Sequence, residues 1–202
     1  RLTWYDFACR YIDMKWPDAS PNHRKSIAEA LASITPVLLT IEVSTDEAQA
    51  ARSALYNWAF NTRRRGTPEQ PEDVTALLDS LQRHARPLRD LQQPDVLRLV
   101  VERISTRLDG QRAAGRSTTL KRRILSNAFS YAVELEVLDH NPLTTLSWKT
   151  PRTAGTVDRR AVANPDQVRA LLDAVRNTPR SGPHLVAFFG CLYYAALRPE
   201  EA

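Results

Sequence analysis

The 202-residue sequence contains few of the residues on which disulfides, metal sites and phosphate-binding loops depend. Its two cysteines, Cys9 and Cys191, lie far apart, and its four histidines lack the i, i+4 spacing of a metal-binding pair. The six glycines form no loop of the kind that cradles phosphate. We therefore expect no disulfide, no metal and no cofactor, which suits a reducing compartment.

Long apolar runs are missing as well. The most apolar stretch, residues 185–197, is shorter than the roughly 20 residues of a membrane-spanning helix, and the first ten residues lack the basic-then-apolar order of a signal peptide. An apolar content of 43% is nevertheless enough to build a hydrophobic core. The sequence predicts a soluble, cytoplasmic protein that does not contact a membrane.

Alternating, strand-like patterns are almost absent, whereas apolar residues recur at helical spacing along most of the chain. This pattern predicts a mainly α fold. Helices are expected over residues 3–15, 20–36, 46–61, 72–84, 95–108, 117–138 and 165–176, followed by a final apolar helix from residue 185.

Apolar density falls between residues 148 and 163, where Thr, Arg, Pro and Gly collect without helical periodicity. Such a composition is typical of an interdomain connector. We therefore predict three segments, namely a helical DNA-binding domain at 1–147, a linker at 148–163 and a second domain that begins at 164 and continues to 202.

Positive charge is unevenly distributed along the chain. The formal net charge is +5, but residues 103–123 alone hold seven basic residues against one acid, Asp109. Most of these are arginines, whose planar fork binds phosphate with two hydrogen bonds, although a GC-rich genome produces the same bias. The distribution favours a polyanionic partner such as double-stranded DNA.

The predicted helix at 117–138 combines an apolar side, which begins at Leu120, with a polar side suited to a DNA groove and its phosphates. A solvated helix face would show the same pattern. The start of the second helix is another candidate, because helix N-termini favour phosphate, and the linker arginines are a third. The predicted DNA-binding residues are Arg116, Thr118, Thr119, Lys121, Arg122, Arg123, Ser126, Arg24, Lys25, Arg159 and Arg160.

The end of the sequence places an arginine directly after an apolar stretch, in the run Leu197-Arg198-Pro199-Glu200-Glu201-Ala202. A guanidinium beside apolar residues needs an anionic partner, either a carboxylate or a phosphate. Glu201, three residues further on, is placed to supply a salt bridge that orients Arg198. An ordinary salt bridge at a helix end would look the same.

This run resembles the first conserved box of the tyrosine recombinase, or phage integrase, family, Thr-Gly-Leu-Arg-x-x-Glu-Leu/Ala. Leu197, Arg198, Glu201 and Ala202 match the box in register, while Ala195-Ala196 replaces its Thr-Gly pair. Upstream, residues 164–172 resemble the helix that opens the family's catalytic domain. Residues 117–143 resemble the last helix of its core-binding domain, so three landmarks occur in the family's order.

The resemblance implies a SAM-like helical core-binding domain followed by the first helices of a truncated catalytic domain. In this family a tyrosine attacks the DNA phosphodiester without a metal, and Arg198 and Glu201 would be, respectively, the first catalytic arginine and its orienting acid. The family's other catalytic groups follow this box, so the chain as given is expected to bind DNA without cutting it. Other recombinase protomers would be partners of the full-length protein, and this part is expected to be monomeric.

Two further interpretations remain open. A free-standing helical DNA-binding or regulatory module explains the basic helix without any role for Arg198. A helical protein-interaction scaffold with incidental positive charge explains the helices alone.

Overall fold

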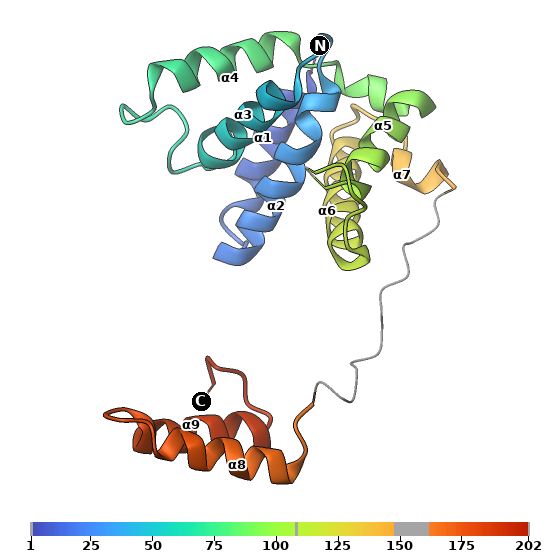
Figure 1. Ribbon diagram of the computed structural model, residues 1–202. Helices are drawn as coiled ribbons and strands as arrows, with labels where there is room; N and C mark the ends of the chain where they lie inside the picture. The colour runs from blue at the N-terminus through green and yellow to red at the C-terminus, as the bar shows by residue number, and fades with distance from the viewer. Residues whose placement is uncertain (1, 108, 148–161, 202) are drawn as a thin grey trace. The chain divides into compact units, whose positions relative to one another are not determined.

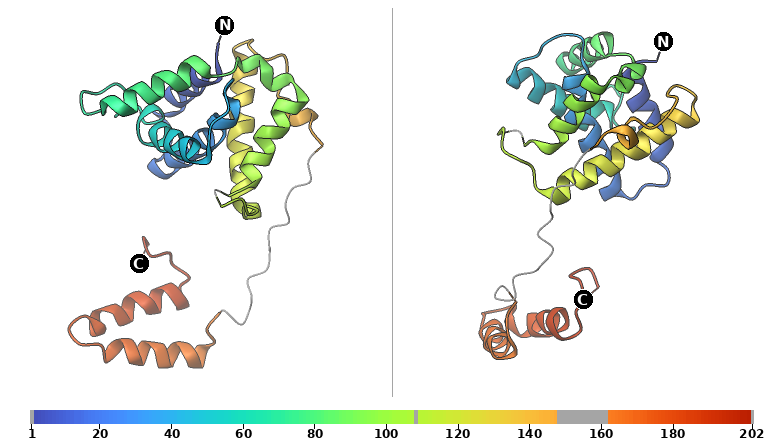
Figure 2. Two further views of the ribbon diagram at one scale, coloured as in Figure 1. Left: turned by 45° about the horizontal axis from the view of Figure 1, so that its top comes forward. Right: turned by 90° about the vertical axis from the view of Figure 1, so that its right-hand side faces the viewer.

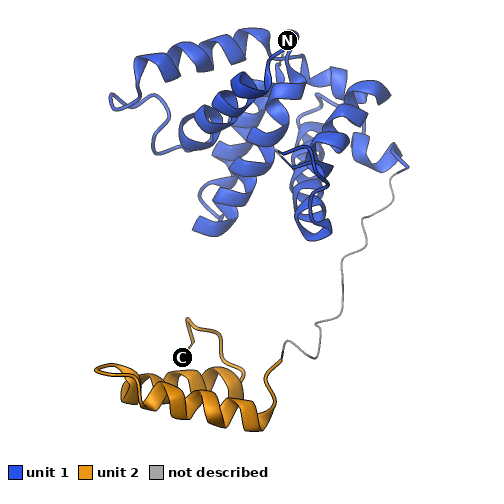
Figure 3. Ribbon diagram, in the orientation of Figure 1, with its two compact units in different colours: residues 1–153 blue, residues 154–202 orange. Residues whose placement is uncertain are grey.

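The computed structural model describes residues 2–107, 109–147 and 162–201. The chain divides into two compact units, an N-terminal unit of residues 1–153 and a C-terminal unit of residues 154–202 (Figure 3). Within the described ranges there are nine α-helices and no strands, which confirms the prediction of a mainly α fold (Figure 1). Most of the predicted linker, residues 148–161, lies outside the described residues.

The N-terminal unit contains seven α-helices joined by short turns and single-turn helices. In chain order, the α-helices and the single-turn helices (η) are α1 (Trp4–Lys15), α2 (Pro21–Ile34), η1 (Thr35–Leu38), α3 (Thr45–Ala54), η2 (Leu55–Ala59), α4 (Glu72–His84), η3 (Leu88–Gln92), α5 (Pro94–Ser105), α6 (Gly115–Glu134) and α7 (Pro142–Thr145). Helix α2 packs against α1, α3, α5 and α6. Figure 2 shows the long α6 along one side of the unit, with α5 and the short α7 packed beside it.

Local capping signals set the helix starts. Ser20 caps α2 by accepting a hydrogen bond from the backbone N–H of His23, and Pro21 occupies the first turn, as the sequence predicts. Helix α3 is capped by Ser44 and begins at Thr45, one residue before the predicted start. Ser44 forms a reciprocal capping box with Glu47, which satisfies two backbone N–H groups at once.

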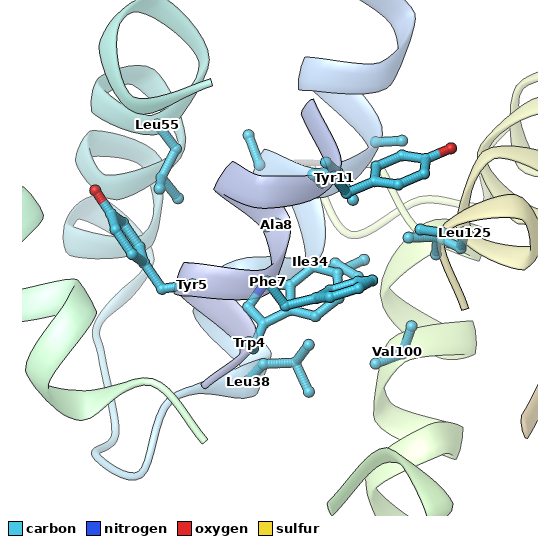
Figure 4. Packing of buried hydrophobic residues seen from close by; sticks show 14 of the residues in the cluster. Trp4, Tyr5, Phe7, Ala8, Tyr11, Ile34, Leu38, Leu55, Val100 and Leu125 are labelled. Atoms are coloured by element: carbon cyan, nitrogen blue, oxygen red, sulfur yellow. The ribbon is translucent and has the colours of Figure 1, made fainter. Parts of the chain in front are cut away.

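The core of the N-terminal unit forms around the aromatic side chains of α1 (Figure 4). Trp4, Phe7 and Tyr11 are almost completely buried. The indole Nε1–H of Trp4 donates to Thr35 Oγ1 over 2.9 Å, and that hydroxyl donates to the carbonyl of Leu31. Because the indole N–H and the Thr35 hydroxyl are both hydrogen-bonded, the cost of burying these polar groups is offset.

Helix α3 continues into a π-helical turn, η2, instead of running on as a regular α-helix to Asn61. Its wide backbone is closed by the N–H of Phe60, which donates to the carbonyl of Leu55 five residues earlier over 2.7 Å. Turns of this kind are rare and occur frequently at functional sites.

The C-terminal unit is a hairpin of α8 (Pro165–Arg176) and α9 (Gly182–Tyr194). Asn164 and Gln167 form a capping box at the start of α8. A Cβ at Gly182 would lie 2.1 Å from the carbonyl oxygen of Val175, so the turn requires glycine. Across the part of the chain that the structure covers, no helix is long and apolar enough to cross a membrane.

Candidate nucleic-acid interface

A groove with a surplus of positive charge lies between α2, α3, α5 and α6 of the N-terminal unit. It encloses about 900 Å³. Five of its lining residues are cations and two are acids, and these are Arg52, Arg103, Arg107, Arg112 and Lys121 against Glu29 and Asp109. We call this feature the basic groove.

The turn between α5 and α6 brings two of these cations together. The N–H of Arg107 donates to the carbonyl of Gln111 over 2.7 Å, and the N–H of Ala113 donates to that of Ser105 over 2.9 Å. Gly110, with a φ of +78°, allows the chain to reverse within this short segment. Arg107 and Arg112 therefore both lie at the rim of the basic groove.

The floor of the groove holds its cations in fixed positions. Glu29 on α2 accepts a hydrogen bond from Arg52 on α3 at 2.5 Å and pairs with Lys121 on α6 at 3.6 Å. Arg103 Nε donates to the carbonyl of Ser33 over 3.2 Å. One carboxylate thus joins two cations that are distant in sequence.

Burial lowers the pKa of Lys121 and that of Arg103, because a low-dielectric environment disfavours the charged form. The positive charge of Arg52 lowers both pKa values further, and Glu29 opposes the shift. The charged forms of Lys121 and Arg103 are therefore less stable in the groove than they would be in water. An anion bound in the groove would stabilise these charged forms.

The start of α6 adds to the positive potential. Ala114 and Ser117 line the groove there, and α6 has no side-chain cap for its first N–H groups. The positive end of the α6 dipole therefore lies at the groove.

The residues predicted on α6 fall into separate groups. Arg116 and Arg123 are exposed, and Lys121 lies in the groove. Thr119 is only partly exposed. Thr118 is fully buried, and its hydroxyl donates to the carbonyl of Ala114, so it belongs to the core and has no surface with which to contact DNA.

Two other residues predicted on α6 hold the following segment of the chain in place. Arg122 donates to the carbonyl of Leu143 over 3.0 Å. Ser126 accepts hydrogen bonds from the side-chain amide of Asn141, which caps α7. These contacts attach α7 to α6, so this part of the polar face is covered by the chain itself. Leu120, expected on the buried side, is instead 43% exposed and lines the groove.

The predicted residues at the start of α2 lie beside a second cavity instead of the basic groove. Arg24 Nε donates to the carbonyl of Trp16 over 2.9 Å, and its guanidinium lies 4.9 Å from the centre of that indole ring. Lys25 is exposed. Arg159 and Arg160 lie outside the described residues.

In the C-terminal unit, Arg198 is exposed and follows the end of α9. The carboxylate of Glu201 accepts a hydrogen bond from the backbone N–H of Arg198 at 2.9 Å, whereas the sequence suggested a salt bridge to its guanidinium. Ala196 has a φ of +52°, in the left-handed region that favours glycine. The chain therefore turns sharply just before Arg198.

Sequence reasoning counted Arg103, Arg107 and Arg112 as charge without assigning them to a site, and it missed Arg52 altogether. Within the described ranges, no group of three or more His, Cys, Asp or Glu residues is placed to hold a metal ion. Comparisons with family models, with curated proteins and with solved structures found no match.

Proposed function

We propose that this chain is the DNA-binding part of a tyrosine recombinase, and that its N-terminal unit binds double-stranded DNA through the basic groove. The observation that carries the proposal is the convergence of five cations from α3, α5, α6 and the turn before α6, with two carboxylates among them. DNA presents a regular line of phosphates, and cations held in place before binding meet that charge at little entropic cost.

The rim and the floor of the groove have different roles in this proposal. Arg107 and Arg112 at the rim, with the exposed Arg116 and Arg123 on α6, reach the phosphates directly. The floor residues Arg103 and Lys121 are partly buried, and they contribute a fixed positive field. About four phosphate contacts, two from the rim and two from the exposed arginines of α6, correspond to a slope near −4 for the logarithm of affinity against the logarithm of salt concentration.

The recombinase assignment is supported by the conformation of Ala196. The family's first box has glycine at this position, and a left-handed φ of +52° is a conformation that glycine adopts without strain. In the complete enzyme, Arg198 would stabilise the negative charge that develops on the attacked phosphodiester. Glu201 would position it by holding its backbone.

The second candidate function is a free-standing helical DNA-binding module. The lining of the basic groove lies within residues 26–121, so DNA binding there requires no residue of the C-terminal unit. The parent gene separates the two candidates. A His-x-x-Arg box and a tyrosine encoded after residue 202 would support the recombinase, and their absence would favour the module.

Fluorescence anisotropy with a labelled duplex at several salt concentrations tests DNA binding. We expect Arg107→Ala combined with Arg112→Ala to weaken binding and to reduce the salt slope by about two units, because two phosphate contacts are lost. A matched control, Arg10→Ala with Arg83→Ala, removes two exposed cations that do not line the groove. Equal effects of the two double variants would contradict the proposal, and no binding by the unaltered protein would favour the protein-interaction scaffold.

A further inference from the structure

A second cavity, separate from the basic groove, lies between the start of α2 and the π-helical turn η2. It encloses about 390 Å³, within the range of small-molecule sites. None of its lining residues belongs to the basic groove. It is therefore a feature that DNA binding in the groove leaves unexplained.

The lining combines three kinds of side chain. All of its charged residues among those described are cations, namely Arg24, Lys25 and Arg63, whereas the basic groove contains two carboxylates. Aromatic walls come from Trp16, Tyr56 and Phe60. The amides of Asn57 and Asn61 complete the polar part of the lining.

Several of these groups are fixed by contacts within the protein. Arg24 is held by the carbonyl of Trp16 and by that residue's indole ring. The side-chain nitrogen of Asn57 donates to the carbonyl of Ser53 over 2.9 Å, so its amide oxygen is the atom available to accept from a ligand. Fixed groups of this kind lose little entropy when a ligand binds.

The π-helical turn supplies two of the lining residues, Tyr56 and Asn57. Turns of this kind are rare within α-helices and occur frequently at functional sites. Here the turn lies at the wall of a cavity with aromatic, amide and cationic groups.

We propose that this cavity binds a nucleotide unit, that is, a planar base joined to a phosphate. The base packs against Tyr56 and meets the amide of Asn57, and the phosphate is bound by Lys25 and Arg63. Aromatic side chains stack on any base, and amides hydrogen-bond to its edge. Three cations without a carboxylate favour an anion over a neutral sugar or an amine.

The nucleotide unit has two possible sources, a free nucleoside 5′-monophosphate and a nucleotide within a single DNA strand. Isothermal titration of the full chain with adenosine 5′-monophosphate, adenosine, inorganic phosphate and a short single-stranded oligonucleotide distinguishes them. We expect the monophosphate or the oligonucleotide to bind more tightly than either adenosine or phosphate, because base and phosphate are recognised together. Tight binding of the oligonucleotide alone would identify the strand as the source.

Two variants test the assignment of residues. Lys25→Ala with Arg63→Ala removes two exposed cations, and we expect about a tenfold or greater loss of affinity for the tighter nucleotide ligand. Tyr56→Leu keeps an apolar side chain while removing the stacking surface, and we expect binding to fall towards that of phosphate alone. The control variant Arg10→Ala with Arg83→Ala should bind as the unaltered protein does.

Three results would overturn the proposal. The first is that neither the monophosphate nor the oligonucleotide binds more tightly than phosphate. The second is that Lys25→Ala with Arg63→Ala leaves the affinity for the nucleotide ligand unchanged. The third is that the control variant loses as much affinity as Lys25→Ala with Arg63→Ala. Arg107 and Arg112 line the basic groove and do not line this cavity. If duplex binding fails in that variant while nucleotide binding persists, the two sites are independent.

Discussion

Glu29 offers a test in which stability and DNA affinity move in opposite directions. Its carboxylate contacts both Arg52 and Lys121 on the floor of the basic groove. Glu29→Gln keeps the shape of the side chain and removes its charge. The substitution therefore weakens two ion pairs within the protein and leaves two cations without their internal counter-charge.

The expected loss of stability is modest. The side chains of Glu29, Arg52 and Lys121 retain exposures of 34%, 27% and 22%, so solvent still screens the two pairs. Pairs of this kind contribute up to about 1 kcal/mol each, which makes a loss of up to about 2 kcal/mol in the free energy of unfolding. For a unit of this size, that corresponds to a decrease of up to roughly 6 °C in Tm.

The expected effect on binding is a gain. Five cations against two carboxylates become five against one, and Arg52 or Lys121 becomes available to a phosphate. We expect tighter duplex binding and a salt slope steeper by about one unit, measured by anisotropy. Glu134→Gln is a matched control, because Glu134 is an exposed glutamate at the opposite end of α6. A lower Tm with unchanged affinity and slope would refute the placement of DNA in the groove.

Three further predictions concern the two units separately. Burial raises the pKa of the Cys9 thiol from 9.0 to about 11, so the unfolded thiol loses its proton first and stability falls as pH rises through this interval. Urea titrations at pH 8 and pH 10 should show a loss of stability that is smaller by roughly 1 kcal/mol in Cys9→Ala, where only the buried Tyr5 and Tyr11, whose pKa values are also raised, still contribute. An equal loss in that variant would contradict the prediction. Ala196→Gly relieves a left-handed backbone, so amide exchange in residues 195–201 should slow, whereas faster exchange would contradict the strain. Trp4→Phe removes the hydrogen bond to Thr35 and part of the buried indole, so we expect thermal unfolding to show a loss of about 2 kcal/mol, and an unchanged Tm would be inconsistent with that contact.

Helix positions could be predicted from the sequence because their signals are local. Ser20 with Pro21, and Asn164 with Pro165, mark the starts of α2 and α8. The end of α6 had no such signal. The chain leaves this helix through Glu136, which adopts a φ of +57° where glycine would ordinarily mark the end, so the predicted helix ran four residues too far.

The basic groove could be predicted only in part. A charge count identifies the surplus at residues 103–123, but Arg52 enters the groove because α3 packs beside α2. Helical periodicity likewise shows that Arg122 and Ser126 share a polar face, without showing that α7 folds back and uses them. Contacts between segments distant in sequence decide both outcomes, and a single sequence carries no signal for them.

Backbone amide chemical shifts, recorded by NMR while duplex DNA is added, show where the DNA contacts the N-terminal unit. We expect the largest changes in the turn between α5 and α6, in the first turns of α6 and in residues 26–33 of α2, which together surround the basic groove. Smaller changes should occur in α4, which contributes no residue to the groove. Changes confined to α4 or to the C-terminal unit, with residues 103–121 unaffected, would contradict the claim that the groove binds DNA.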